Sequence, residues 1–207
     1  MSERELLDRG LAQLGLDIPE HIRKLLLRYV ALLAKWNQTY NLTAVREPEK
    51  MVGHHLLDSL AVLPYVKCSS MVDVGTGAGL PGVPLAITQP TCEVVLLDSS
   101  HKKASFLRQV VMELMLTNIS VRCERVETLG SEQYDVVISR AFAEVGEFLQ
   151  LAGALCAPKG TIVAMKGIYP YEELREIKLP FKLDEVVKLD VPNVEGDRHL
   201  VLISRVT

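Results

Sequence analysis

Four closely spaced glycines, Gly75, Gly77, Gly79 and Gly82, follow a short apolar segment that carries a single acid. Residues 71–87 read MVDVGTGAGLPGVPLAI, so the first three glycines form G-x-G-x-G and the last three form G-x-G-x-x-G. Glycines after a strand let the backbone turn sharply and approach a ligand, and the helix that follows offers free N–H groups. The segment therefore predicts a loop that binds a small-molecule cofactor.

Two acids bear on the identity of that cofactor. Asp98 lies 19 residues after Gly79, where an acid binds ribose hydroxyls, but any adenosine cofactor needs the same contact. Asp73 is more informative, because an ionisable residue inside a strand is costly unless it faces a cationic or polar group. The α-amino group of S-adenosylmethionine is such a partner, directly or through water, whereas nicotinamide dinucleotides carry no cation near this turn. The acids favour S-adenosylmethionine, with a dinucleotide or a turn without a ligand as alternatives.

A second set of reactive positions lies at the end of a later strand, where residues 139–142 read SRAF. The sequence has no N-P-P-Y or D-P-P-Y tetrad suited to exocyclic amino groups, and no Pro-Cys pair for attack on a pyrimidine carbon 5. The pattern fits a target that is already nucleophilic, such as guanine N7, which needs alignment and exclusion of water but no general base. We expect Arg140 to bind the cofactor carboxylate, a phosphate or guanine O6, and Phe142 to stack on a flipped base or pack in the core.

The elements that must position these residues fall into a helical first third and a remainder in which strands and helices alternate. Apolar residues recur with the helical period in the first third, where Ser2 and Glu5 form a capping box. The alternation that follows predicts parallel strands covered by helices, closed by an antiparallel hairpin at one edge. The expected helices cover residues 2–14, 17–36 and 48–66 and begin again near Leu80, His101 and Glu144, and the expected strands cover 71–74, 93–97, 119–123, 136–139, 161–165, 184–191 and 199–206.

Composition narrows the class of protein. The 207 residues are 48% hydrophobic, which suffices for a full core, and the net charge of −3 gives no overall cationic field. Any contact with nucleic acid must therefore come from a local basic face. Four widely spaced cysteines include no C-x-x-C pair and no histidine at metal-ligand spacing, so we expect no metal site and a reducing cytoplasm. The charged, amphipathic N-terminal segment is typical of neither a signal peptide nor a membrane span.

Eight short motifs occur in order along the chain, and together they resemble one family. They are NLT at 41–43, HxxDS at 55–59, DVGTGAGLPGVPLA at 73–86, DSSHKKASFL at 98–107, RVE at 125–127, ISRAFA at 138–143, MKG at 165–167 and RHLV at 198–201. The family is ribosomal RNA small-subunit methyltransferase G, also called glucose-inhibited division protein B. The resemblance implies that the turn at Arg125 lies against the adenine, with Val126 and Glu127 contributing, and that the helical layer caps the cofactor cleft.

These observations lead to one hypothesis and two competitors. We expect an α/β protein with the Rossmann-like class I methyltransferase fold: a mostly parallel seven-stranded sheet, an antiparallel edge hairpin and an N-terminal helical extension. Residues 1–68 would form the helical cap and residues 69–207 the methyltransferase domain of one compact unit. The protein would use S-adenosylmethionine to methylate guanine N7 in 16S ribosomal RNA, and the resemblance alone points to the guanine at position 527. The competitors are an NAD(P)-dependent oxidoreductase and a non-catalytic S-adenosylmethionine-binding ribosome-assembly factor.

The candidate site residues fall into three sets, and their partners follow from them. The expected partner is 16S ribosomal RNA in the small subunit or an assembly intermediate, and the protein is expected to be a cytoplasmic monomer without membrane contact. His55 and Asp58 share a helix face, and we expect them to belong to a structural hydrogen-bonding cluster. We expect Arg140 to act in catalysis as a positioning group; Asp73, Gly75, Gly77, Gly79, Leu80, Asp98, Val126, Glu127 and Arg140 to bind the cofactor; and Lys102, Arg125, Lys166 and Arg198 to form a basic rim for RNA.

Overall fold

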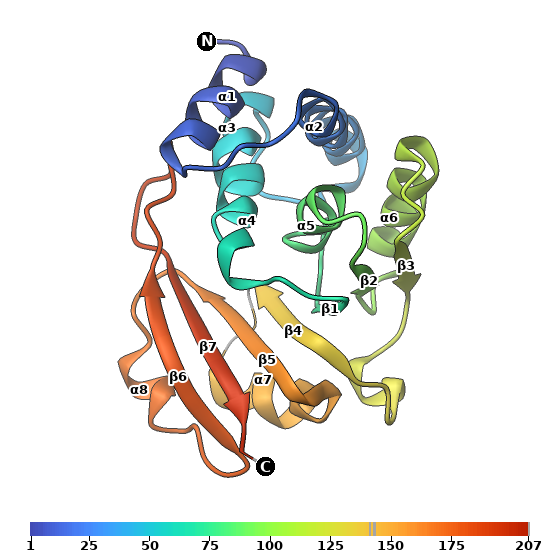
Figure 1. Cartoon of the computed structure of the whole chain (residues 1–207). Coiled ribbons are helices and arrows are strands. Elements are labelled where there is room, and N and C mark those ends of the chain that lie inside the picture. The colour runs from blue at the N-terminus through green and yellow to red at the C-terminus, as the bar shows by residue number, and fades with distance from the viewer. Residues whose placement is uncertain (141, 143, 207) are drawn as a thin grey trace.

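A seven-stranded sheet forms the centre of the molecule (Figure 1). The computed structural model describes residues 1–140, 142 and 144–206, so Ala141 and Ala143 of the SRAF region lie outside the described residues. The strand order is β3-β2-β1-β4-β5-β7-β6, with β1 to β5 parallel, β7 antiparallel to β5, and β6 antiparallel to β7. The strands are β1 (Ser70–Val74), β2 (Glu93–Leu97), β3 (Ile119–Arg122), β4 (Tyr134–Arg140), β5 (Cys156–Lys166), β6 (Phe181–Lys188) and β7 (His199–Arg205).

The strand order reverses direction at β1, which lies between β2 and β4. In open α/β sheets, ligands bind beyond the carboxyl ends of the strands at such a switch point. Asp73 occupies this position in the register, opposite Leu96 of β2 on one side and Ile138 of β4 on the other. The predicted mostly parallel sheet with an antiparallel edge pair is confirmed, and its switch point falls at the glycine loop.

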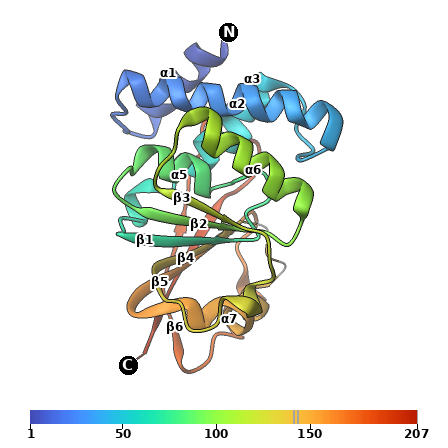
Figure 2. The ribbon, with the colours of Figure 1, turned by 90° about the vertical axis from the view of Figure 1, so that its right-hand side faces the viewer.

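Helices cover both faces of the sheet (Figure 2). One face carries α5 and α6 together with the N-terminal helices, and the opposite face carries α7. Tyr29 and Leu33 of the N-terminal region are fully buried in the same apolar cluster as Leu80 and Phe106 of the later region. The two regions therefore share one core, and a boundary at residue 68 stays a prediction. The helices are α1 (Glu3–Gln13), α2 (Glu20–Tyr40), α3 (Pro48–Met51), α4 (Asp58–Leu60), α5 (Gly82–Thr88), α6 (His101–Leu114), α7 (Val145–Ala152) and α8 (Tyr171–Leu174).

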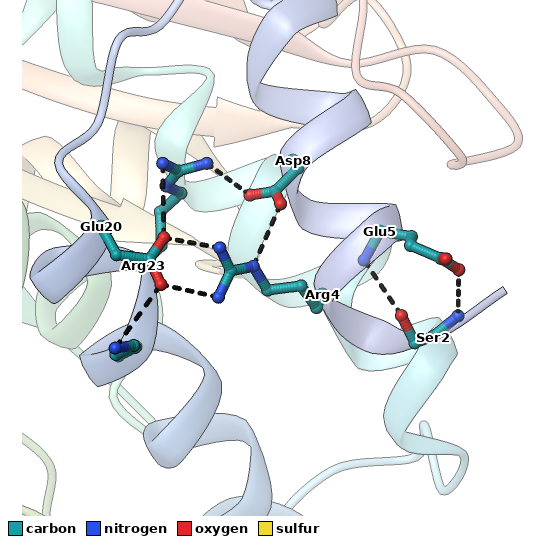
Figure 3. Close-up of polar contacts among 7 residues, drawn as sticks. Ser2, Arg4, Glu5, Asp8, Glu20 and Arg23 are labelled. Atoms are coloured by element: carbon teal, nitrogen blue, oxygen red, sulfur yellow. Dashed lines mark hydrogen bonds and ion pairs between the residues drawn. The ribbon is translucent and has the colours of Figure 1, made fainter.

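Polar contacts fix the start of the chain on α2 (Figure 3). The predicted capping box is present, since the Ser2 hydroxyl accepts from the Glu5 N–H and the Glu5 carboxylate accepts from the Ser2 N–H. Arg4 donates to Asp8 one turn later and makes two hydrogen bonds, of 2.7 and 2.6 Å, to Glu20 of α2. Because these side chains are exposed, each ion pair contributes little to stability. The buried leucines of α1 contribute more to its packing against the rest of the protein.

The segment predicted as one helix over residues 48–66 is irregular. After α3 the chain makes a π-helical turn over Val52–Leu57, continues as α4, and ends in a 3₁₀ turn over Leu63–Tyr65. A π turn inserts an extra residue into the helical ladder and changes which side chains share a face. His55 and Asp58 belong to two separate hydrogen-bonded groups: His55 Nε2 lies 2.8 Å from Thr43 Oγ1, whereas Asp58 bonds to Arg140 and Arg198.

The edge strand β6 also differs from its prediction, since it covers Phe181–Lys188 and not 184–191. A register shift between Leu183 and Glu185 offsets its pairing with β7, as an irregularity in an edge strand does. Within the part of the chain that the structure describes, no helix combines the length and apolar character needed to cross a membrane.

Candidate active site

The glycines of the loop after β1 have separate tasks. Gly75, Gly77 and Gly79 have φ of +69°, +62° and +93°, a conformation that side chains other than glycine rarely adopt. A β-carbon on Gly75 or Gly77 would meet no atom closer than 3.9 Å, so it would make only ordinary van der Waals contact there. A β-carbon on Gly79 would lie 2.5 Å from Val83 Cγ2, and Leu80, which follows, is buried. The first two glycines thus leave room for a ligand, and the third allows the loop to pack on α5.

The Asp73 carboxylate binds the two ends of this loop through hydrogen bonds. Its Oδ2 accepts hydrogen bonds from the Thr76 hydroxyl (2.6 Å) and from the Gly82 N–H (2.8 Å). Its Oδ1 is buried and has no hydrogen-bond partner among the described residues. Burial raises the pKa of Asp73 to about 6, although both hydrogen bonds oppose the rise. An unpaired buried carboxylate oxygen is costly, and a cationic group of a ligand would satisfy it.

Asp98 holds the loop from the end of β2. Its Oδ2 accepts from the Gly77 N–H (3.0 Å) and pairs with the Lys103 ammonium (3.1 Å), and its Oδ1 accepts from the Ser100 N–H (2.9 Å). The Ser100 hydroxyl, at the N-cap of α6, makes no capping bond, and the Asp98 carboxylate holds the backbone just before the helix through the Ser100 N–H. The acid therefore stabilises both the loop and the helix start.

A cavity of about 320 Å³, here called the β1–β2 cavity, lies at the carboxyl ends of these strands. Its wall beyond β3 is a 3₁₀ turn over Val126–Leu129 that follows Arg125. Arg125 is exposed and makes no ion pair within the described residues, since the neighbouring Glu124 pairs with Arg122. The cavity brings together five of the predicted cofactor or RNA residues. Its lining consists of Val74, Gly75, Leu97, Asp98, Ser99, Lys103, Glu124, Arg125, Val126, Glu127, Phe142 and Leu151.

A second cavity of about 540 Å³, here called the Arg140 cavity, shares Phe142 with the first. The Phe142 ring lies 5.2 Å from the ring of Phe148 on α7, so it is supported on one side by the core and lines both cavities. Three cationic side chains and two carboxylates face this space, which leaves one excess positive charge. Its lining consists of His54, Asp58, Arg140, Phe142, Met165, Lys166, Gly167, Ile168, Glu173, Leu189, Arg198 and His199.

Asp58 joins two arginines in the Arg140 cavity. Its Oδ2 lies 3.0 Å from Arg140 Nη1 at the end of β4, and its Oδ1 lies 2.9 Å from Arg198 Nε before β7. Arg140 also donates to the backbone carbonyl of His54 at 3.0 Å. The Asp58 side chain is only 4% exposed, so both of its ion pairs are shielded from solvent. One carboxylate of α4 thus anchors two strand-end segments of the sheet.

The predicted site residues are divided between the two cavities and positions outside them. Arg140 was expected to bind the cofactor, but it lines the second cavity, so that contact stays a prediction. Lys166 and Arg198 line the same cavity, and the Lys166 ammonium lies 2.6 Å from Glu173 Oε2. Lys102 lies outside both cavities, where its ammonium donates to the Tyr40 carbonyl at 2.6 Å. The bridge at Asp58 has no local signal in the sequence, because its two partners, Arg140 and Arg198, lie 82 and 140 residues further along the chain.

Known proteins are similar to this chain in sequence, and others are similar to it in fold. Residues 22–201 match the family model described as rRNA small subunit methyltransferase G. Relatives named Ribosomal RNA small subunit methyltransferase G include one from Chromobacterium violaceum, 52% identical over 197 residues and 94% of each chain. Another, from Nitrosospira multiformis, is 49% identical over 204 residues, covering 95% of this chain and 94% of the relative.

Solved structures with the same fold are far less similar in sequence. TrmN from Thermus thermophilus has a TM-score of 0.60 and 16% identity, covering 82% of this chain and 53% of that one. A SAM-dependent O-methyltransferase from Thermotoga maritima has a TM-score of 0.54 and 13% identity, covering 72% of this chain and 65% of that one. At this identity the structures establish the fold, and the sequence matches establish the family. The chain belongs to the ribosomal RNA small subunit methyltransferase G family.

Proposed function

We propose that this protein transfers a methyl group from S-adenosylmethionine to N7 of a guanine in 16S ribosomal RNA, the guanine at position 527 by family resemblance. The observation that carries the proposal is the pair of adjoining cavities that share Phe142 at the switch point of the sheet. One cavity adjoins a glycine loop with an unpaired buried carboxylate oxygen, and the other combines apolar side chains with an excess positive charge. The names of the relatives support ribosomal RNA of the small subunit as the substrate.

The residues of the first cavity fit S-adenosylmethionine. Asp73 Oδ1 would receive the α-amino group, directly or through water, and Gly75 and Gly77 leave their open sides to it. Asp98 would bind the ribose, and the turn at Val126 would lie against the adenine. The sulfonium of the bound cofactor supplies an electrophilic methyl group. A nicotinamide dinucleotide fits less well, because it offers no cation to the unpaired oxygen of Asp73.

The residues of the Arg140 cavity position the target base. Guanine N7 has an available lone pair, so the protein needs to align the base and exclude water, and no side chain has to remove a proton. Arg140 and Arg198 can donate to guanine O6 or to a phosphate, and Phe142 can stack on the base. Methylation leaves a positive charge on the purine. Because the cavity already has one excess positive charge, its cations would hold guanine O6 or a phosphate and would not stabilise the cationic product.

His55 is unsuited to act as a general base in this scheme. Burial, followed by the charge of Arg140, lowers the pKa of His55 to about 4, and its Nε2 is held at 2.8 Å from the Thr43 hydroxyl. The imidazole is thus neutral and fixed inside the cap.

The protein is further proposed to act as a cytoplasmic monomer on the small subunit or on one of its assembly intermediates. Residues 1–68 would serve as the cap and residues 69–207 as the catalytic domain of one unit, which the shared core of the two regions supports. Arg125, Lys102, Lys166 and Arg198 would contact RNA.

Methyl transfer from radiolabelled S-adenosylmethionine to small subunits that lack the modification tests the proposal. Digestion of the product RNA and mass spectrometry of the nucleosides should give 7-methylguanosine. Another methylated nucleoside would contradict the proposed target atom. Binding of adenosylhomocysteine without any transfer would instead favour the non-catalytic assembly factor.

A further inference from the structure

A third depression lies outside the two cavities of the active site. It has a volume of about 380 Å³ and is here called the aromatic groove. It lies where the end of α2 meets the beginning of α6, two helices that pack against each other. The groove is lined by Trp36, Tyr40, His101, Lys102 and Ser105.

Two aromatic rings form a firm platform in this groove. The rings of Trp36 and Tyr40 are stacked, with centroids 5.1 Å apart and an angle of 29° between their planes. Trp36 also packs on Phe106, whose side chain is fully buried, with ring centroids 5.6 Å apart. Tyr40 remains 41% exposed. The core thus supports the inner ring of the platform while the outer ring faces solvent.

The polar groups beside the platform are cationic or neutral. The Lys102 ammonium donates to the Tyr40 carbonyl at 2.6 Å, which uses one of its three N–H donors and holds it beside the rings. His101 lies next to it, with Nδ1 at 3.4 Å from Cys123 Sγ. No carboxylate lines the groove within the described residues. Aromatic rings next to a fixed ammonium group match an unstacked nucleobase and its phosphate.

We propose that the aromatic groove binds an unstacked nucleotide of the RNA substrate, separate from the base that receives the methyl group. This inference rests on the proposed function, because ribosomal RNA is the substrate expected at this edge of the sheet. The groove is adjacent to the active site: Lys102 lines the groove, whereas Lys103, the next residue of α6, lines the β1–β2 cavity and pairs with Asp98. An RNA strand that enters the active site can therefore place a neighbouring base on Tyr40.

The chain provides its own probe for this site, because Trp36 is its single tryptophan. Titration of the full-length protein with single-stranded oligoadenylate should quench the tryptophan emission to a saturating value. A double-stranded RNA of equal length should not, because its bases stay stacked on one another. Added salt should weaken the binding, because the phosphates contribute through Lys102.

Two variants and one matched control complete the test. Tyr40→Ala and Lys102→Ala should each weaken oligoadenylate binding about fivefold or more, since one stacked base contributes on this scale. Lys24→Ala removes the same charge from an exposed position at the other end of α2 and should leave RNA binding unchanged. All three variants should bind adenosylhomocysteine with wild-type affinity, which shows that they are folded.

The outcomes separate this inference from the proposed function. RNA binding without quenching, or wild-type RNA binding by both Tyr40→Ala and Lys102→Ala, would overturn the groove assignment. Quenching by ribosomal proteins and not by RNA would also overturn it and identify a protein-binding surface. A wild-type protein that shows the quenching but transfers no methyl group would reject the proposed function and leave the groove as an RNA site.

Discussion

Replacement of Asp73 by asparagine removes one charge and leaves most of the geometry of the loop intact. The asparagine carbonyl can accept both hydrogen bonds that Asp73 Oδ2 now accepts, from the Thr76 hydroxyl and from the Gly82 N–H. The amide nitrogen then takes the place of Oδ1, which is buried without a partner among the described residues. The variant thus places a neutral N–H donor where the wild type has a carboxylate oxygen that could accept a hydrogen bond from a cation.

The effect on stability follows from the pKa of the buried acid. Burial raises the pKa of Asp73 from 3.8 to about 6, so the folded state binds this proton more tightly than the unfolded state. The contribution of Asp73 to the free energy of unfolding is therefore largest below about pH 4 and is lost as the pH rises to about 6. At about 1.4 kcal/mol for each tenfold change in proton affinity, the loss is about 3 kcal/mol. Relative to the wild type without ligand, Asp73→Asn should gain about 3 kcal/mol between about pH 4 and pH 7.

The effect on cofactor binding has the opposite sign at neutral pH. A hydrogen bond between an ammonium group and a carboxylate contributes roughly 1.5–3 kcal/mol. Loss of that interaction at Oδ1 should weaken adenosylhomocysteine binding about 10- to 150-fold at pH 7.5. Wild-type affinity should also fall when the pH drops below about 6, as Asp73 becomes protonated, whereas the asparagine variant should lack this dependence.

Titration calorimetry with adenosylhomocysteine and urea unfolding at several pH values measure the two effects. Thr76→Val is a matched control, because it removes a hydrogen bond to Oδ2 and leaves Oδ1 unchanged. If Asp73 acts only by shaping the loop, Thr76→Val should lose affinity, whereas Asp73→Asn, which keeps both loop hydrogen bonds, should not. Wild-type affinity of Asp73→Asn at pH 7.5, or a stability difference that does not change with pH, would refute the reasoning.

Three further predictions concern the loop and the cap. Gly77→Ala should abolish adenosylhomocysteine binding at a modest cost in thermal stability, whereas Gly79→Ala, whose β-carbon would lie 2.5 Å from a valine methyl, should impair folding; equal thermal melts would contradict this. Asp58→Asn leaves Arg140 and Arg198 without a counter-charge, so the free energy of unfolding in urea should fall by on the order of 3 kcal/mol. The variant should also lose methyl-transfer activity. His55→Gln should be less acid-sensitive than the wild type between about pH 6 and pH 4, because protonation of the buried imidazole destabilises the fold; parallel stability curves across this range would contradict the prediction.

Patterns within a few residues carried the successful predictions. The strand Glu93–Leu97 and the start of α6 at His101 were predicted at their observed bounds, because apolar runs and helix-start residues are local signals. The four loop glycines were predicted for the same reason, and Gly75, Gly77 and Gly79 have positive φ. The sequence did not separate their roles, since packing of Gly79 against Val83 depends on how α5 folds back.

Features that depend on distant residues could not be read from the sequence. The direction of the Arg140 side chain is set by Asp58, a residue of α4, and not by its neighbours in β4. The π-helical turn before Asp58 is likewise stabilised by tertiary packing, since nearly all of its residues are buried. Phe142 was predicted either to stack on a base or to pack in the core, and it contacts Phe148 while it also lines both cavities.

The double ion pair of Asp58 makes three distant positions energetically interdependent. Removal of Arg140 changes what Arg198 contributes, because the carboxylate that they share then has a single partner. The effects of substitutions at the three positions should therefore be non-additive, and double-mutant cycles should give coupling energies of about 0.5–3 kcal/mol. Relatives that have replaced one member are then expected to have replaced another, so that co-variation links the helical cap to the last strand of the sheet.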